Sequence, residues 1–499
     1  MRGIMPLFFS SAIWEGRIMR ILIVIFLILI ASIYFTFVLQ PTPTPLDLYK
    51  KIEKGFAPDM LFPSFDSDKT PKTVEITLYP NWYITNLPTH PIRSWFNVAF
   101  DASTPTNIFN DLPPMANVIL HFDNEVGALH LEIFIRRSYN AFLEWPQTTL
   151  IFIPESPYIS LDSSFPYFSY LALDFDTQRF IIGRTKISWG YWDYPVAISP
   201  TSPYFNHITY EFLSSNWFSY TFHLISINPI LTPEEYEKQK THVPVNADNM
   251  DPYSDRVKTL AAHRLEFKIS DNLRWAIGEL GLFGGKIPDV YSLNPVAIWH
   301  NLYNAAFINV IGNLQVSWTP IKGLNLFLDF ALDDFAIPFT EKEDVKPSAY
   351  ALSLGIIKTV KILDLDTLLE FSYSLTTKWV YNMFVPYLKF DNRQLILSNF
   401  PTGARVIYSY PIGFKYGPDA QLFSLKLSLM REKLIGEIEP FYLLKGPATI
   451  LVDYKSELPS SLETFFGIRG YFESPWGFGF NVLVLNTIWH VGGFYKLEF

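Results

Sequence analysis

From residue 72 to its last residue the chain repeats one unit: a stretch in which polar and apolar residues alternate, then a tight turn or a long loop. In 324–333 (LNLFLDFALD) every second residue from Leu324 is apolar, and Asp329 and Asp333 lie between. Successive side chains of a strand point to opposite faces, so each stretch predicts a strand with one apolar and one polar face. Many such strands in one chain favour a transmembrane antiparallel β-barrel, apolar outside and polar within. The same alternation occurs at 72–78, 264–269, 369–375 and 423–429.

The lengths of the connections support this architecture. Barrels of the outer membrane have short turns on the periplasmic side and long extracellular loops. Short connections are expected at 123–127, 176–178, 214–217, 270–272, 320–323, 362–366, 431–433 and 473–477, with long ones between most of them. Followed through the chain, this alternation predicts about 18 strands. A range of 16–20 stays open, because 92–102 reads either as a further strand or as part of an outer loop.

The last eleven residues, WHVGGFYKLEF, have the pattern of a closing strand. Tyr495, Leu497 and Phe499 share one face and are expected to meet lipid, whereas Lys496 and Glu498 are expected to face the lumen. This strand should pair with 72–78 to close the cylinder. Phe499 is then the expected signal for the barrel-insertion machinery.

Composition fits the same fold. The chain is 49% apolar and 17% aromatic but only 17% charged, against about 25% charged residues in an average soluble protein. A large soluble β-protein is the alternative. The net charge of −9, without a basic cluster, argues against nucleic-acid binding. The absence of cysteine excludes disulfides, thiolate metal sites and cysteine nucleophiles.

The first 40 residues read as an export segment. Arg20 precedes the uncharged run 21–39, which is followed by the polar, proline-rich QPTPTP. This is the arrangement of a secretory signal, although the run is also long enough for an uncleaved anchor. Met19 is a plausible alternative start. Residues 41–71 are expected to be a periplasmic linker with a short helix at 46–54, and residues 72–499 to be the barrel.

Five motifs occur in an order that resembles the capsule-assembly Wzi family of outer-membrane barrels. They are LDFDTQRFIIGRTKISWG (173–190), HRLEFKISDNLRWAIGELGLFGG (263–285), SLNPVAIWHNLY (292–303), SWTPIKGLNLFLDFALDDF (317–335) and YPIGFKYGPDAQ (410–421). The resemblance implies an 18-stranded barrel that acts as a surface lectin and holds exported polysaccharide at the cell surface. The chain departs from some members, because the segment before Lys72 is too short for a substantial periplasmic helical bundle.

Aromatic side chains beside hydrogen-bonding groups on outer loops are the candidate glycan site, because sugar rings stack on flat aromatic faces. The same aromatics would equally form an interfacial girdle or the loops' own small core. The candidates are Trp189, Tyr191, Trp192, Asp193 and Tyr194 in one loop, Trp299, His300 and Tyr303 in another, and Asp419 in a turn-like YGPDA motif.

Charged residues on the polar strand faces are expected to line the lumen, because at mid-membrane a lipid-facing Arg or Lys costs ~2–4 kcal/mol. These residues are Arg264, Glu266, Lys268, Arg274, Glu279, Asp329, Asp333 and Glu370. Both signs occur, so the set predicts either an internal salt-bridge lattice or a polar conduit.

No motif of a serine hydrolase, a zinc protease or a phosphate-binding loop is present, so we expect neither enzyme activity nor a cofactor. An isolated pair such as His223 with Ser219 or Ser226 keeps an outer-membrane hydrolase as a minor alternative. The leading interpretation is a monomeric outer-membrane barrel that binds surface polysaccharide. A porin-like channel or a structural barrel is the main alternative.

Overall fold

The computed structural model describes residues 44–60, 73–86, 97–99, 114–124, 126–136, 148–149, 167–175, 177–215, 217–241, 254–290, 292–302, 307–335, 346–397, 405–454 and 456–499. The expected export segment, residues 1–40, lies outside these ranges. So does the second part of the expected linker, residues 61–71.

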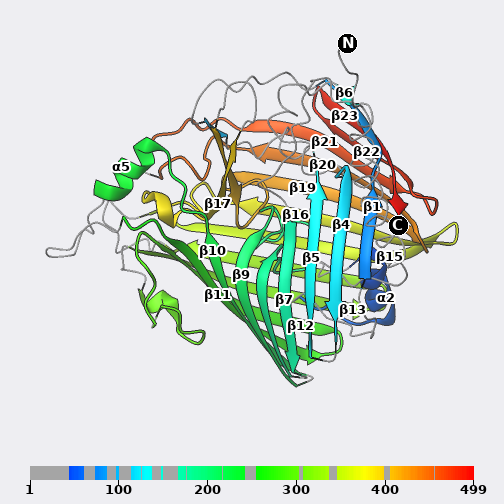
Figure 1. Ribbon diagram of the computed structural model, residues 1–499, viewed down its shortest axis with the longest axis horizontal. Coiled ribbons are helices and arrows are strands. Elements are labelled where there is room, and N and C mark those ends of the chain that lie inside the picture. Colours follow the sequence, from blue (N-terminus) through cyan, green and yellow to red (C-terminus); the bar gives the residue numbers. More distant parts are fainter. Residues whose placement is uncertain are drawn as a thin grey trace, which may run out of the picture.

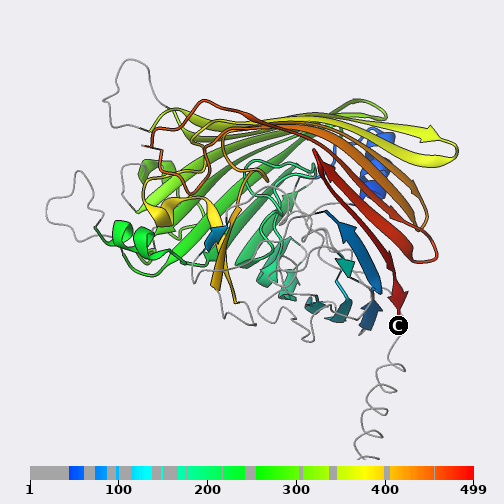
Figure 2. The same cartoon turned by 90° about the horizontal axis from the view of Figure 1, so that it is seen from above.

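An antiparallel sheet wraps into a barrel (Figures 1 and 2). β1 and β2 form one interrupted strand, and so do β23 and β24. On that count, and with the two-residue β6 set aside, the described residues build a wall of 18 strands. The wall strands are β1 (Thr73–Leu78), β2 (Asn81–Thr85), β4 (Ala116–Asp123), β5 (Gly127–Ile135), β7 (Tyr167–Phe175), β8 (Gln178–Thr185), β9 (Phe205–Ser215), β10 (Phe218–Ile227), β11 (Lys258–Ser270), β12 (Leu273–Gly284), β13 (Ile308–Ile321), β14 (Leu324–Asp334), β15 (Ala349–Ile362), β16 (Leu365–Thr376), β19 (Ala420–Arg431), β20 (Leu434–Lys445), β21 (Glu463–Glu473), β22 (Phe478–Leu485), β23 (Ile488–Tyr495) and β24 (Leu497–Glu498).

The remaining elements lie outside the wall sequence. They are α2 (Pro45–Lys54), β3 (Asn97–Ala99), β6 (Thr148–Thr149), α5 (Pro233–Thr241), η1 (Trp299–Leu302), η2 (Pro386–Leu388), β17 (Asp391–Leu397) and β18 (Arg405–Pro411). β3 pairs with β18 in a separate small sheet, so the described part of the expected segment 92–102, Asn97–Ala99, is not a wall strand. Within the described ranges, no helix is long and apolar enough to cross a membrane.

The predicted fold class is confirmed, and the eight predicted short turns fall between strands that the structure pairs as hairpins. Two of them contain glycines with positive φ, Gly323 (76°) and Gly477 (82°), a conformation that glycine adopts without a Cβ clash. The turn between β15 and β16 instead uses Leu363 and Asp364 at positive φ. Turns of this kind join neighbouring strands at minimal length.

The barrel closes where the sequence predicted. Thr77 pairs with Glu498 and Leu78 with Leu497, and β2 continues the pairing along β23. Phe499 extends the seam, because its N–H donates to the carbonyl of Ile76 at 2.9 Å and its carbonyl accepts from the Ile76 N–H at 3.2 Å. Tyr495 and Phe499 are exposed on the outward side.

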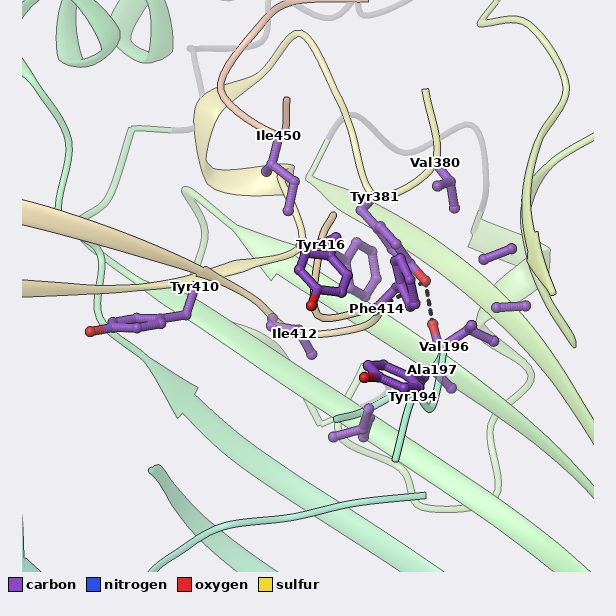
Figure 3. Packing of buried hydrophobic residues seen from close by; sticks show 14 of the residues in the cluster. Tyr194, Val196, Ala197, Val380, Tyr381, Tyr410, Ile412, Phe414, Tyr416 and Ile450 are labelled. Carbon is purple, nitrogen blue, oxygen red and sulfur yellow. Dashed lines mark hydrogen bonds between the residues drawn. The ribbon is translucent and has the colours of Figure 1, made fainter. Parts of the chain in front are cut away.

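Three segments lie in the lumen, and we call them the plug: residues 44–60, residues 186–204, and a third segment made of 377–397 and 405–419. Their apolar side chains pack with inward-facing residues of the wall in one large cluster and one smaller one. Figure 3 shows part of the large cluster, in which the Tyr381 hydroxyl donates to the carbonyl of Val196 at 2.5 Å. Two long outer loops therefore meet inside the barrel.

The first plug segment enters at the short-turn end, opposite α5 (Figure 1). α2 is capped at its start by Thr44, whose side chain accepts the N–H of Asp47, and at its end by Gly55 in the left-handed conformation. Its buried Leu48, Tyr49 and Ile52 pack on inward residues of β14, β15, β16 and β19. The helix expected in a periplasmic linker thus lies inside the barrel mouth.

A buried ionic network holds the third plug segment to the wall. Asp391 accepts from Lys258 Nζ of β11 at 2.6 Å and from Arg393 Nε at 2.7 Å, and Arg393 Nη2 donates to Glu235 of α5 at 2.9 Å. Burial alone would raise the pKa of Asp391, but the charges of Arg393 and Lys258 outweigh burial and hold that pKa well below its usual range. The network contains two positive and two negative groups.

Deleting Phe499 removes the last backbone pair of the seam and the terminal aromatic side chain. We expect a smaller fraction of the protein to insert, measured as the heat-modifiable band on gels. Phe499→Tyr is the control and should insert normally. Normal insertion of the deletion variant would contradict the prediction.

Replacing Arg393 by Met should destabilise the β17–β18 hairpin by about 3–5 kcal/mol, the range for removing one partner of a buried ion pair. The physical reason is that Glu235 and Asp391 lose their common partner. Hydrogen exchange in β17 is the measurement. Arg393→Lys keeps the charge and should cost less; equal protection in all three proteins would refute the network's role.

Candidate functional site

The loop 186–204, the leading glycan candidate, folds into the barrel. Trp189, Tyr191, Trp192 and Tyr194 are all buried. The expectation that these side chains are exposed on an outer loop is therefore wrong. Their large apolar surface gains more from burial against the wall than from contact with water.

Tyr191 and Trp192 have structural partners. The Trp192 ring stacks on Phe327 with centroids 4.8 Å apart. The Tyr191 hydroxyl lies 2.8 Å from Ser317 Oγ and donates to Asn325 Oδ1 at 2.6 Å, while burial raises its pKa. This pair packs in the same cluster as α2. In this structure the two rings are core residues.

Asp193 and Tyr194 instead reach a polar pocket between the plug and β19–β23, which we call the lumen pocket. Asp193 pairs with Lys426 Nζ at 3.1 Å, and Lys426 also lies 3.4 Å from Glu437. Tyr194 donates to Glu439 and accepts from Arg469 Nη1 at 2.7 Å. Burial raises the pKa of the Tyr194 hydroxyl, which keeps it a hydrogen-bond donor.

The lumen pocket encloses about 370 Å³, within the roughly 300–1,000 Å³ typical of small-ligand sites. Three cationic and three acidic side chains balance each other in its lining, and hydroxyl, amide and imidazole groups add donors and acceptors. The lining is Asp193, Tyr194, Lys415, Lys426, Glu437, Glu439, Arg469, Gly470, Tyr471, Asn481, Val482, Leu483 and His490. A neutral ligand with many hydroxyl groups matches this chemistry.

His490 is a buried histidine in the lining of the pocket. It is 1% exposed, and neither ring nitrogen has a hydrogen-bond partner among the described residues. Its ring lies 5.5 Å from that of Tyr83. A buried imidazole without partners has lost its hydrogen bonds to water and gained none in return. A ligand in the pocket that hydrogen-bonds to the ring nitrogens would replace those lost bonds.

The second candidate loop, which carries Trp299 and His300, packs on the outward face of the wall. Glu279 lies opposite His263 on the neighbouring strand. His263 precedes the inward Arg264 by one residue, so His263 and Glu279 both face outward. Its carboxylate accepts the N–H groups of Trp299 at 2.9 Å and His300 at 2.6 Å. The prediction that Glu279 lines the lumen is therefore wrong. Tyr303 lies outside the described residues.

Trp299 is buried and stacks on His263 with ring centroids 4.5 Å apart, so it covers the barrel wall. Asp419 adopts a positive φ of 57° in a turn. Its carboxylate accepts from the Ala448 N–H at 3.1 Å, which ties the end of the third plug segment to the β20–β21 loop. The structure does not bring Trp299, His300 or Asp419 to the lumen pocket.

The other predicted lumen residues lie on inward faces and form ion pairs or hydrogen bonds with the plug and each other. Arg264 Nη1 donates to the Met60 carbonyl at 2.9 Å, and Arg274 Nη1 to Glu266 Oε1 at 3.1 Å. The Asp329 carboxylate accepts from the Val196 N–H at 2.8 Å. The remaining members pair locally: Lys268 with Asp271, Asp333 with Lys346, and Glu370 across strands from Lys426. The sequence left two alternatives for these residues, an internal salt-bridge lattice and a polar conduit, and their contacts form the lattice.

His223, the histidine of the two candidate hydrolase pairs, bonds a threonine rather than Ser219 or Ser226. His223 Nδ1 lies 2.7 Å from Thr209 Oγ1 on the inward face. Ser226 is three residues further along the strand and therefore faces outward. Among the described residues, no cluster of three or more potential ligands is placed to hold a metal ion.

Sequence reasoning missed most of the pocket. Lys426 appeared only as part of an alternating strand, and Arg469, Tyr471, Asn481 and His490 were not singled out. The available signal was their phase, since all of them fall on inward positions of strands β19, β21, β22 and β23, which lie close together in the wall. Which inward residues border open space depends on where the plug lies.

Comparison with known proteins supports the fold. No family model and no curated protein sequence matches the chain. Among solved structures, the chain is similar to Wzi of Escherichia coli, an outer-membrane protein involved in group 1 capsule assembly and described as a carbohydrate-binding β-barrel. The TM-score is 0.54 and the identity 12%, over 92% of this chain and 99% of Wzi.

Two further solved structures, from other bacteria, match more weakly. Acinetobacter baumannii OccAB4 has a TM-score of 0.39 at 11% identity, over 87% of this chain and 100% of its own. Pseudomonas aeruginosa OpdQ has a TM-score of 0.43 at 7% identity, over 86% and 97%.

Proposed function

We propose that this protein is an outer-membrane barrel that binds surface polysaccharide, and that the lumen pocket receives one of its sugar units. The observation that carries the proposal is the pocket itself: balanced charges, many hydrogen-bonding groups and an unsatisfied buried His490. Hydroxyl groups both donate and accept, so a sugar unit can satisfy such a lining without adding charge.

The filled lumen supports binding over conduction. The plug segments are held by hydrogen bonds and ion pairs from three directions: α2 at the short-turn end, loop 186–204 along the wall, and the third plug segment beside α5. The description of Wzi, which shares the fold, as a carbohydrate-binding barrel is a further support. We further propose that the protein acts without enzyme activity.

The binding test uses purified protein and bead-immobilised surface polysaccharide of the producing cells, with an oligosaccharide array in parallel. His490→Phe keeps a planar aromatic ring and removes both nitrogens, and Lys426→Met removes a cation that pairs with Asp193 and Glu437. Each should weaken binding about tenfold, which corresponds to ~1.4 kcal/mol. Ser353→Ala is the control and should bind normally, because Ser353 is a buried inward residue outside the pocket lining whose hydroxyl lies 2.9 Å from Ser374 Oγ.

Two outcomes would contradict the proposal. Absence of binding to every polysaccharide tested would overturn the function. Wild-type affinity in both pocket variants, with binding lost on truncation of outer loops, would move the site away from the lumen pocket.

The plug predicts low conductance in planar bilayers. Thr185 and Phe205 face each other across the hairpin, so a linker of about four residues can replace 188–204 and still join β8 to β9. This variant should open in steps several times larger than the wild type. Shortening 286–302, a segment on the outward face, is the control. Large, steady, ion-selective steps from the wild type would favour the porin-like alternative.

A further inference from the structure

A polar row crosses the outward face near the long-loop end of five neighbouring strands. Cross-strand pairing places its members side by side from β7 to β11. The row is Ser169, Arg184, Asn206, Ser226 and Thr259. Arg184 is its one charged member; its Nε donates to Asn206 Oδ1 at 2.8 Å, and its guanidinium carbon lies 4.0 Å from the Tyr204 ring centroid.

The next outward row is apolar. Ile182, Ile208 and Leu224 pair with one another two residues further along each strand, about 7 Å nearer the membrane centre by the rise of a strand. Both rows border one surface depression of about 500 Å³, which we call the outer groove. The groove is therefore polar and cationic at its rim and aliphatic below.

The segment 286–302 extends this aliphatic surface. Trp299 fixes the segment to the outward face of β10–β13, where it packs with Ala261, Phe283 and Ile308. Val290 and Val296 remain 88% and 73% exposed. Since outward faces of a transmembrane barrel meet lipid, exposed aliphatic side chains on this face are continuous with the lipid-contacting surface.

Depth explains why charged groups are tolerated here. A cation facing lipid at mid-membrane costs ~2–4 kcal/mol, but near the interface the cost falls to about 0–1 kcal/mol. Phosphate groups of lipids lie at that interface, and a guanidinium matches a phosphate with paired N–H donors.

We propose that the outer groove binds a phosphate-bearing lipid of the outer leaflet. Its headgroup lies against Arg184, Asn206 and Ser226, and its acyl chains run along Ile182, Ile208 and Leu224. This site is on the opposite face of the wall from the lumen pocket. It rests on the barrel fold and is independent of polysaccharide binding.

The test exploits the absence of cysteine, because a single introduced cysteine can be labelled without background. Phe180→Cys places a bimane below the groove, and Phe371→Cys places one on β16; both native side chains are exposed. The protein is reconstituted in phosphatidylcholine vesicles that contain a minor share of either brominated phosphatidylglycerol or brominated phosphatidylcholine. The ratio of the two quenching efficiencies cancels differences in label depth.

At Phe180 the ratio should show about fivefold enrichment of the anionic lipid, the effect expected for one basic residue near a membrane surface. At Phe371 it should be near one. Arg184→Gln should bring the Phe180 ratio to one, and Arg184→Lys should retain most of the enrichment. Millimolar inorganic phosphate should leave the ratio unchanged.

A ratio of one at Phe180 in the unsubstituted background overturns the proposal, and that comparison stands even if Arg184→Gln fails to fold. Enrichment that survives Arg184→Gln also overturns it. Loss of enrichment in inorganic phosphate would assign the site to a free anion and overturn the lipid assignment.

Discussion

Closure of the sheet between its first and last strands is the constraint on which the rest of the barrel depends. In a bilayer, every unpaired backbone N–H or C=O costs several kcal/mol, so an open sheet edge is not tolerated. The seam from Ile76 to Thr85 against 490–499 satisfies those groups. Once the cylinder is closed, strand alternation alone assigns each side chain to lipid or lumen, and the positions of both candidate sites follow from that assignment.

A closed wall of 18 strands leaves a lumen wide enough to need filling. The plug does this with segments far apart in the chain that share partners. The Met60 carbonyl accepts from Arg264 of the wall at 2.9 Å and from the Gly190 N–H of the inward loop at 3.2 Å. Because this one carbonyl accepts from the wall and from a second plug segment, neither donor can move away without leaving a buried polar group unpaired. The charged residues inside the barrel therefore hold the plug in place, and the lumen pocket is the space that the plug leaves open.

The wall was predictable and the plug was not. Alternation fixed the strands, turns and seam because strand phase is a local property of the sequence. The aromatic loop carried no such information, since Trp189 and Tyr194 suit a sugar platform, a girdle or a core equally well. Glu279 shows a second limit: its charge suggested the lumen, but a loop that folds over the outside supplies two N–H donors to it. Local pattern cannot reveal which distant segment will cover a residue.

β9 shows how one strand serves two environments. Its inward His207 bonds Thr185 Oγ1 at 2.8 Å and Thr209 Oγ1 at 2.7 Å, while its outward Asn206 and Ile208 border the outer groove. A one-residue slip in register would exchange the two sets and place an imidazole against lipid. The groove and the packed lumen are thus specified by the same register, and evolution of either side is confined to alternate positions. The outward and inward side chains of β9 can therefore be varied separately, provided that the register is kept.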